Sequence, residues 1–402
     1  MAEDGKITVL FVNPSNGLSG DTQSLAFLIE SLKQKVLPIV LLTEEGDAYR
    51  LFKSHGIECL IHPYQNVLAL PFLDYLKNVV LHPWRFRFVK WFRYDLPCLR
   101  YVKRVLAGRK VDIVHTNTAP TYMGARIAKM YNVPHVWHVR EYLDDTHCIG
   151  RIFFGRRWLR KQINEASARI VVSSPCRDFW QFKDDGTYTI NDAVLNKDDC
   201  CYEEPKQSYL LFCSYWVTEG KGVFSAVRAY GKSGLFRDGI RLKVVGNTSS
   251  ETVLKIKALT EEYNCTGMVD CIPVQKDVKP LFAKAMAYIN PSINEGMGRT
   301  TGEAMFYGCP VVARASGGTL DLIKSGETGW LFTTEEECAS LLKMVCSTDQ
   351  KDIILNAQKF ACEHLSTGNY GNRIMDVYNK MLSNKLQLEK ALRRAKDKKV
   401  CE

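Results

Sequence analysis

Two carboxylates, Glu295 and Glu303, bracket a short glycine-rich stretch of the chain. Residues 286–291 before the stretch have the apolar character of a buried strand, and a short helical segment after it ends at Gly308. The glycine loop therefore presents backbone N–H groups at a helix N-terminus, which is a site for anions. One carboxylate lies on the loop and the other about one turn into the helix. This arrangement suits a diphosphate with hydroxyl groups on either side, as in a nucleotide sugar.

Short apolar runs alternate with helical segments on both sides of this motif. The expected strands are 6–12, 37–42, 55–61, 111–115, 133–138, 169–174, 209–213, 241–246, 267–273, 286–291 and 311–313. The alternation predicts an α/β protein with two doubly wound parallel sheets. We expect an N-terminal domain over 1–196 and a C-terminal domain over 206–369, separated by a polar, acidic linker. A basic helix at about 370–395 is expected to pack back on the first domain.

The composition is that of a globular protein. The chain has 402 residues, 46% of them hydrophobic and 24% charged, with a formal net charge of +10. Its 14 cysteines lack the paired spacing of a zinc site, and no signal-peptide core follows Met1. We therefore expect a reduced, cytoplasmic setting. No apolar run approaches the ~18 residues of a membrane-spanning helix.

The stretch from Pro291 to Phe332 resembles glycosyltransferase family 4. The similarity rests on the order and spacing of many pieces: Pro291-Ser292, Glu295-Gly296-Met297-Gly298, Glu303-Ala304-Met305, Gly308-Cys309-Pro310-Val311-Val312, Gly317-Gly318 and Ser325-Gly326-Glu327-Thr328-Gly329-Trp330-Leu331. The resemblance extends more loosely to Asn13–Gly20, to 111–115 and to His138. It implies the GT-B fold, in which two Rossmann-like domains face each other across a cleft that holds the substrates.

The resemblance also implies roles for single residues. Glu303 is expected to bind the donor ribose, Glu295 the transferred sugar and Lys221 the diphosphate, while His138 faces the donor sugar. Catalytic roles are thus expected for Glu295, His138 and Lys221, with Glu141 helping to hold the acceptor. Further donor-binding residues are Gly296, Met297, Gly298, Arg299, Thr300, Ser214, Gly17 and Gly20. Alternatively, the two glutamates cap a helix and face solvent, Lys221 is a solvated loop lysine and His138 is structural.

Two departures from the family pattern concern the diphosphate. The family often has an arginine after the strand that ends at Cys213, but this chain continues Ser214-Tyr215-Trp216. A serine hydroxyl is a weaker donor than a guanidinium fork, so we expect Arg299 to compensate. In addition, Asp192 stands where the family's junction motif has a glycine.

Cations and aromatic residues interleave in two segments, 76–110 and 151–161. Such segments suit contact with an anionic membrane surface, which favours a lipid-linked or other glycan acceptor. A nucleic acid is not expected, because a nucleotide-sugar site provides no reason for one. The alternative is a pair of amphipathic helices with aromatic residues in the core and solvated cations.

The sequence thus favours a retaining glycosyltransferase that uses a UDP-sugar or GDP-sugar donor, at the inner face of a membrane, in polysaccharide or glycoconjugate synthesis. We expect no cofactor and no metal, because the Asp-x-Asp pattern of metal-dependent glycosyltransferases is missing. Two alternatives stay open: a non-catalytic partner subunit with a degenerate donor site, and a sugar-nucleotide epimerase of the same fold.

Overall fold

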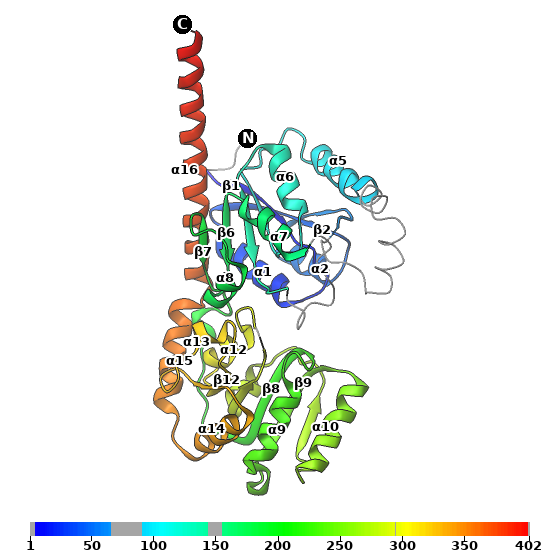
Figure 1. The fold of residues 1–402 in the computed structure, drawn as a ribbon, viewed down its shortest axis with the longest axis vertical. Helices are drawn as coiled ribbons and strands as arrows, with labels where there is room; N and C mark the ends of the chain where they lie inside the picture. Colours follow the sequence, from blue (N-terminus) through cyan, green and yellow to red (C-terminus); the bar gives the residue numbers. More distant parts are fainter. Residues whose placement is uncertain (1–4, 66–90, 144–154, 294, 401–402) are drawn as a thin grey trace. The chain divides into compact units, whose positions relative to one another are not determined.

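The computed structural model describes residues 5–65, 91–143, 155–293 and 295–400. These residues form two compact units, each with its own sheet (Figure 1). Unit 1 comprises Met1–Val172, Arg177–Ile190 and Tyr370–Glu402, and unit 2 comprises Ser173–Cys176 and Asn191–Asn369. The C-terminal segment of the chain therefore returns to the N-terminal unit.

Unit 1 is built on a seven-stranded parallel sheet of order β3-β2-β1-β4-β5-β6-β7. Its strands are β1 (Ile7–Val12), β2 (Val36–Leu42), β3 (Glu58–Ile61), β4 (Ile113–Thr116), β5 (His135–Val139), β6 (Ala168–Val171) and β7 (Thr187–Thr189). Its helices are α1 (Gly20–Leu32), α2 (Asp47–Ser54), the π-helical turn η2 (Trp91–Asp95), α5 (Leu96–Val105), α6 (Met123–Tyr131), α7 (Gly155–Asn164) and most of α8 (Ser174–Trp180) and α16 (Thr367–Val400).

Unit 2 repeats this plan with a six-stranded parallel sheet of order β10-β9-β8-β11-β12-β13. The strands are β8 (Gln207–Val217), β9 (Arg241–Thr248), β10 (Val269–Ile272), β11 (Ala285–Asn290), β12 (Val311–Arg314) and β13 (Trp330–Phe332). The helices are η3 (Lys197–Asp199), α9 (Val223–Ser233), η4 (Leu235–Asp238), α10 (Ser250–Glu262), α11 (Lys279–Lys284), α12 (Arg299–Phe306), α13 (Thr319–Leu322), α14 (Glu335–Ser347) and α15 (Lys351–His364). The prediction of two doubly wound α/β domains is confirmed.

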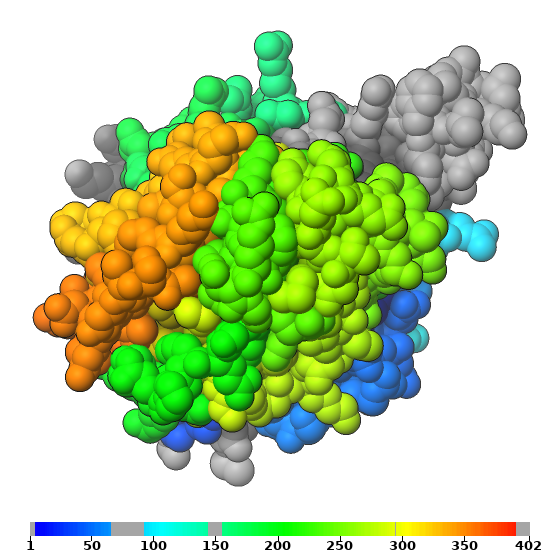
Figure 2. All heavy atoms as spheres, turned by 90° about the horizontal axis from the view of Figure 1, so that it is seen from below, coloured from blue at the N-terminus to red at the C-terminus, as the bar shows by residue number. Residues whose placement is uncertain are grey.

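Helices cover the sheets and exclude water from them. In unit 2, α9 packs on β8 and β9 with α10 beside it, α14 packs on β11 to β13, and in Figure 2 their side chains form a closed surface from yellow-green through green to orange. Phe212, Tyr230 and Leu242 at the centre of this layer are at most 2% exposed. Burial on both faces explains why the central strands read as continuous apolar runs without alternation.

The strand order places the loops that bear the motifs. In each unit the chain first winds to one side of a central strand and then crosses to the other, between β1 and β4 and between β8 and β11. The carboxyl-end loops of these neighbouring strands diverge, and ligands of doubly wound sheets bind at this point. The loops after β8 and β11 carry Lys221 and Glu295, respectively. Those after β1 and β4 carry Asn13 and Asn117.

Some boundaries differ from those predicted. The strand expected from His55 begins at Glu58, because α2 runs to Ser54 and Gly56 turns the chain at a φ of +71°. The strand expected over 209–213 continues to Val217 through an irregularity in its register with β9. The predicted domain borders at 196, 206 and 369 compare with unit borders at 190/191 and 369/370. Within the described part of the chain, no helix combines the length and apolarity needed to cross a bilayer.

Candidate functional site

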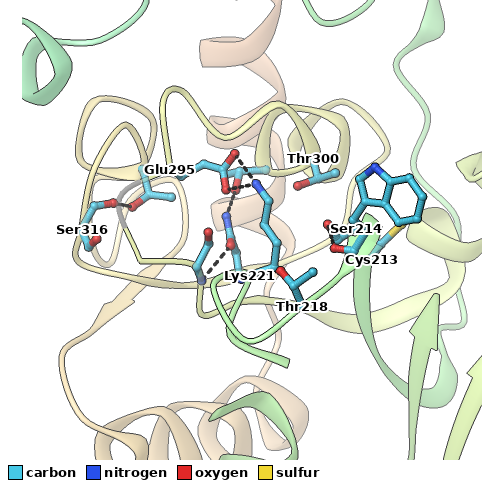
Figure 3. A network of polar contacts seen from close by, with 12 residues as sticks. Cys213, Ser214, Thr218, Lys221, Glu295, Thr300 and Ser316 are labelled. Carbon is cyan, nitrogen blue, oxygen red and sulfur yellow. Dashed lines mark hydrogen bonds and ion pairs between the residues drawn. The ribbon is translucent and has the colours of Figure 1, made fainter. Parts of the chain in front are cut away.

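Lys221 and Glu295 form an ion pair at the switch point of unit 2 (Figure 3). The Lys221 Nζ lies 3.0 Å from Oε1 and 2.8 Å from Oε2 of Glu295. The side chains are 34% and 18% exposed, so the pair is partly shielded but open to a ligand. The sequence predicted the two residues in separate roles. The structure brings them into direct contact.

Gly222 makes this contact possible. It precedes α9 with a φ of +78°, and a Cβ at this position would lie 2.5 Å from the Pro291 carbonyl oxygen. Only glycine combines this backbone conformation with so close an approach. The loop after β8 therefore lies against the end of β11, which places Lys221 beside Glu295. The Gly318 N–H fixes the other side of the loop by donating to the Glu295 carbonyl at 2.6 Å.

The glycine loop enters α12 through Gly298, which has a left-handed φ of +92°. Two polar contacts tie the first turn of the helix to β11: the Tyr288 hydroxyl donates to Thr300 Oγ1 at 2.7 Å, and the Asn290 amide donates to Thr301 Oγ1 at 2.8 Å. The N-terminus of α12, with its backbone N–H groups, is thus held rigidly beside the Lys221–Glu295 pair. Met297 is buried, and its sulfur accepts from the Asp192 N–H.

Glu303 lies one turn into α12 and contacts Arg299. Glu303 Oε1 is 3.4 Å from Arg299 Nε, and both side chains are 16% exposed. Burial raises the pKa of Glu303, whereas the charge and hydrogen bonding of Arg299 oppose that rise. Arg299 therefore favours the ionised form of this largely buried carboxyl group, against the effect of burial.

The Nη1 and Nη2 groups of Arg299 contact the main chain just after it enters unit 2 at Asn191. Its Nη1 donates to the Ala193 carbonyl at 3.1 Å and its Nη2 to the Val194 carbonyl at 3.0 Å. Arg299 thus donates to main-chain carbonyls, whereas the sequence suggested that it binds the diphosphate. Ser214 is also engaged, because its hydroxyl donates to the Trp216 carbonyl at 2.9 Å. Both substitutes proposed for the missing arginine thus have protein partners.

In unit 1, His138 lies next to the last residue of β5, within a buried polar network. Its Nδ1 lies 3.2 Å from His115 Nε2 and 3.3 Å from Arg140 Nη2. The other nitrogen of His115 contacts the Tyr378 hydroxyl of α16 at 2.6 Å. His138 is fully buried, and burial together with the Arg140 charge holds its pKa well below the usual value for histidine. His138 is therefore neutral at pH 7.

Arg140 joins this network to the loops at the switch point of unit 1. Its guanidinium donates to the side-chain and main-chain oxygens of Asn117 at 3.1–3.2 Å. The Asn117 amide in turn donates to Asn13 Oδ1 at 2.8 Å and to the Asp21 carbonyl at 3.0 Å. The ends of β1, β4 and β5 are thus connected by hydrogen bonds. Sequence reasoning did not single out Arg140, Asn117, His115 or Tyr378.

Glu141 holds two loops together. Its carboxylate accepts from the backbone N–H groups of Ala119 at 3.3 Å and Arg140 at 2.7 Å. Burial and the negative charge of Asp21 raise its pKa to about 8, although the two N–H donors oppose that rise. These contacts give Glu141 a structural role in unit 1. Its predicted part in holding the acceptor stays a prediction.

Gly17 lies on the loop after β1 and Gly20 is the first residue of α1; neither has a positive φ, and an added Cβ at either position would meet no atom within 4 Å. The fold of unit 1 therefore does not itself require glycine at these positions. Among the described residues, no group of three or more His, Cys, Asp or Glu side chains is arranged to hold a metal ion.

The basic segments are described in part, since residues 76–90 and 151–154 lie outside the described residues. The buried faces of α5 and α7 carry Cys98, Val102, Leu159 and Ile163. Exposed cations lie on the other faces: Arg100, Lys103, Arg104, Arg156, Arg157 and Lys161. These four apolar residues thus belong to the core, whereas Phe92 just before α5 is 59% exposed and Val105 is 38% exposed.

Models of known protein families match a segment in each half of the chain. The family model for the glycosyl transferase 4-like domain matches residues 38–178, and the one for glycosyl transferases group 1 matches residues 202–359. Curated relatives include sucrose-phosphate synthase 4 of Arabidopsis thaliana, 30% identical over 32% of this chain and 14% of that protein. Trehalose synthase of Pyrococcus horikoshii is 26% identical over 47% of each chain. The chain thus spans less than half the length of these relatives.

Solved structures share the fold over nearly the whole chain. Anabaena HepE in complex with UDP and glucose has a TM-score of 0.75 at 18% identity, covering 93% of this chain and 100% of HepE. Sucrose-phosphate synthase from Thermosynechococcus elongatus has a TM-score of 0.72 at 15% identity, covering 94% and 100%. With both domain models matched in order and both sheets present, the chain belongs to the glycosyltransferases of GT-B fold, with the domain pair expected of family 4.

Proposed function

We propose that this protein is a retaining glycosyltransferase that moves a sugar from a nucleoside diphosphate to an acceptor hydroxyl. The observation that carries the proposal is the Lys221–Glu295 ion pair beside the N-terminus of α12, with the buried Glu303 one turn further on. A cation, a row of N–H donors and two carboxylates are what a diphosphate between a ribose and a sugar requires.

The ion pair is suited to exchange partners when a donor binds. A diphosphate oxygen competes with Glu295 for the Lys221 ammonium group, and the sugar hydroxyls become donors to the released carboxylate. Negative charge then grows on the diphosphate as the glycosidic bond breaks, and a fixed ammonium group and fixed N–H dipoles stabilise that charge. Glu303, whose negative charge Arg299 favours, accepts from the ribose hydroxyls.

The uridine nucleotides in neighbouring structures suggest the donor to test first. HepE was solved with UDP-glucose, and TarM of S. aureus with UDP. UDP-sugars are therefore our first choice and GDP-sugars our second. We propose that the reaction needs no metal, since Lys221 and α12 supply the positive potential. Loss of turnover in chelator, restored by a divalent ion, would refute this part.

A second candidate function is a non-catalytic subunit with a weakened donor site. It is favoured by the protein contacts of Ser214 and Arg299, which leave Lys221 as the one cation placed at the predicted diphosphate position among the described residues. Calorimetric titration with UDP and GDP, followed by release of nucleoside diphosphate from the sugar donors with and without lipid extract, separates the two functions. Binding without turnover on any acceptor supports the second.

Matched variants sharpen this test. Lys221→Met should abolish most turnover, whereas Lys255→Met removes an equivalent ammonium group paired with Glu251 at 2.8 Å on an exposed helix face and should have no effect. The anomeric configuration of the product, read by NMR, tests retention, and an inverted product would refute it. Failure of every nucleoside diphosphate to bind would refute the donor site itself.

The acceptor side of the proposal concerns membranes. We propose that the exposed cations of α5 and α7 hold the protein at an anionic surface, where a glycan or lipid-linked acceptor is available, at the cytoplasmic face. The interaction is electrostatic, because the apolar faces of these helices are buried. Flotation with anionic vesicles at low salt, reversed by salt and not seen with neutral vesicles, is the expected result. Absence of binding at low salt would refute it.

A further inference from the structure

Two thiols of unit 2 lie in contact, although 162 positions separate them in the sequence. The Sγ atoms of Cys200 and Cys362 are 3.2 Å apart. Cys200 directly follows the turn η3, and Cys362 lies in the last turn of α15. Both residues are half-buried, so neither belongs to the closed core of the unit. Two thiols in contact are the reactants of a disulfide bond.

Main-chain hydrogen bonds on both sides of Cys200 hold it against α15. Before it in the chain, the Val194 N–H donates to the Leu365 carbonyl at 2.8 Å, just beyond the end of the helix. After it, the Cys201 carbonyl accepts from the side-chain amide of Gln358, within the helix, at 2.7 Å. The contact between the sulfur atoms is therefore built into the fold of unit 2.

We propose that Cys200 and Cys362 form a reversible disulfide bond when a small disulfide compound, such as oxidised glutathione, is in excess. The sulfur atoms need to approach by about 1 Å to reach the ~2.05 Å of such a bond. A bond at this place joins the segment before β8 to α15, and both belong to unit 2. The reaction is independent of the proposed sugar transfer and gives the chain a modification site outside the candidate site.

The oxidation proceeds by two exchange steps. One protein thiolate attacks a sulfur atom of oxidised glutathione, forms a mixed disulfide and releases the first glutathione thiolate. The second protein thiolate attacks the protein sulfur of that mixed disulfide and releases the second glutathione. One S–S bond forms as another breaks. The two protein sulfurs are oxidised, oxidised glutathione gains two electrons, and the two thiol protons pass to the glutathione thiolates.

The Cys200 thiol keeps its proton at pH 7. Burial, the hydrogen bond with Cys362 and the charge of that neighbour raise the pKa of Cys200 to about 12, and the nearby Cys201 and Asp199 act in the same direction. Since the thiolate is the form that reacts, oxidation is expected to be slow at pH 7 and faster at pH 9.

The bond closes a loop that contains most of unit 2, including Lys221 and Glu295. Cross-linking so long a loop lowers the entropy of the unfolded chain, and the melting temperature of the unit should rise by about 5–10 °C. The segment that the bond fastens also supplies the Ala193 and Val194 carbonyls that hold Arg299. Oxidation thus stabilises the unit that bears the candidate site and adds no group to the site itself.

The test is made on the folded full chain, equilibrated with excess oxidised glutathione. The remaining thiols are then alkylated, and the disulfides are located by mass spectrometry of the peptides. We expect a pair of peptides joined through Cys200 and Cys362 that dithiothreitol separates. A bond from Cys201 to Cys362, glutathione left on both members of the pair, or two unmodified thiols would overturn the proposal.

Serine variants provide the controls. Cys200→Ser and Cys362→Ser should each lose both the bond and the rise in melting temperature. Cys271→Ser removes an exposed thiol of β10 and should oxidise at the pair as the wild-type chain does. The peptide map of the wild-type chain decides the assignment even where a serine variant folds poorly. A cross-linked chain that melts at the temperature of the reduced chain would refute the stabilising role.

Discussion

Replacing Arg299 by Met distinguishes an anchor of the glycine loop from a ligand of the diphosphate. Met keeps most of the aliphatic volume and removes the guanidinium. In the structure that group donates to the Ala193 and Val194 carbonyls and contacts Glu303 at 3.4 Å. The variant therefore leaves two carbonyl acceptors and one carboxylate without their cation, all within unit 2.

The expected loss of stability follows from these contacts. A hydrogen bond from a charged donor contributes about 1.5–3 kcal/mol, and breaking a buried charge pair by removing one partner costs about 3–5 kcal/mol. Both estimates describe the loss of the same guanidinium group and are not added, so we expect the free energy of unfolding to fall by about 3–5 kcal/mol. The control Arg241→Met breaks a pair with Asp270 in which both side chains are over a third exposed, and should cost at most about 1 kcal/mol.

Urea unfolding of both variants and titration with UDP at two pH values provide the assay. Burial raises the pKa of Glu303 and Arg299 lowers it, so removal of Arg299 should raise that pKa further. The carboxyl group then protonates at a higher pH, and UDP affinity of Arg299→Met should be weaker at pH 6 than at pH 8. Loss of UDP affinity with unchanged stability would refute the anchor and favour direct contact with the diphosphate. Wild-type affinity and kinetics would remove Arg299 from the site.

Three further predictions concern Lys221 and two buried titratable groups. Lys221→Met should lower kcat by ~10²–10³, measured as release of nucleoside diphosphate; a loss below threefold would contradict a role at the leaving group. The pKa of Glu141 is about 8 in the folded chain and near 4.5 when unfolded, so the stability it contributes is present below pH 4.5 and is lost as pH rises to 8. Glu141→Gln should therefore gain stability relative to wild type between pH 5 and 8, by at most about 4 kcal/mol, and parallel stability curves would contradict this. His135 has a folded pKa of about 3, below its ordinary 6.5, so its contribution is present above pH 6.5 and is lost on acidification. Wild type should lose about 2 kcal/mol more than His135→Gln between pH 7 and 5 in urea unfolding, and equal losses would show that His135 is not buried in its neutral form.

Much of the local structure was predictable because its causes are local. The run 286–291, the loop at Gly298 and the stop at Gly308 are short-range signals of strand, turn and helix, and β11 and α12 lie where they indicate. The boundary error at His55 arose because an apolar run cannot reveal where a preceding helix ends. The roles of Lys221 and Glu303 came from a family resemblance, which supplies long-range information that periodicity lacks.

The amino-acid sequence by itself determined the two α/β domains, the glycine loop and the order of its carboxylates, since these follow from side-chain periodicity and backbone preferences over a few residues. Only the tertiary structure decided the partners. Lys221 meets Glu295 because crossover connections place β8 beside β11, and Tyr378 meets His115 because α16 returns to unit 1. Arg299 contacts the 193–194 carbonyls for the same reason. Such contacts join residues 74 to 263 positions apart, and their energies depend on burial and charge that exist only once the chain has folded.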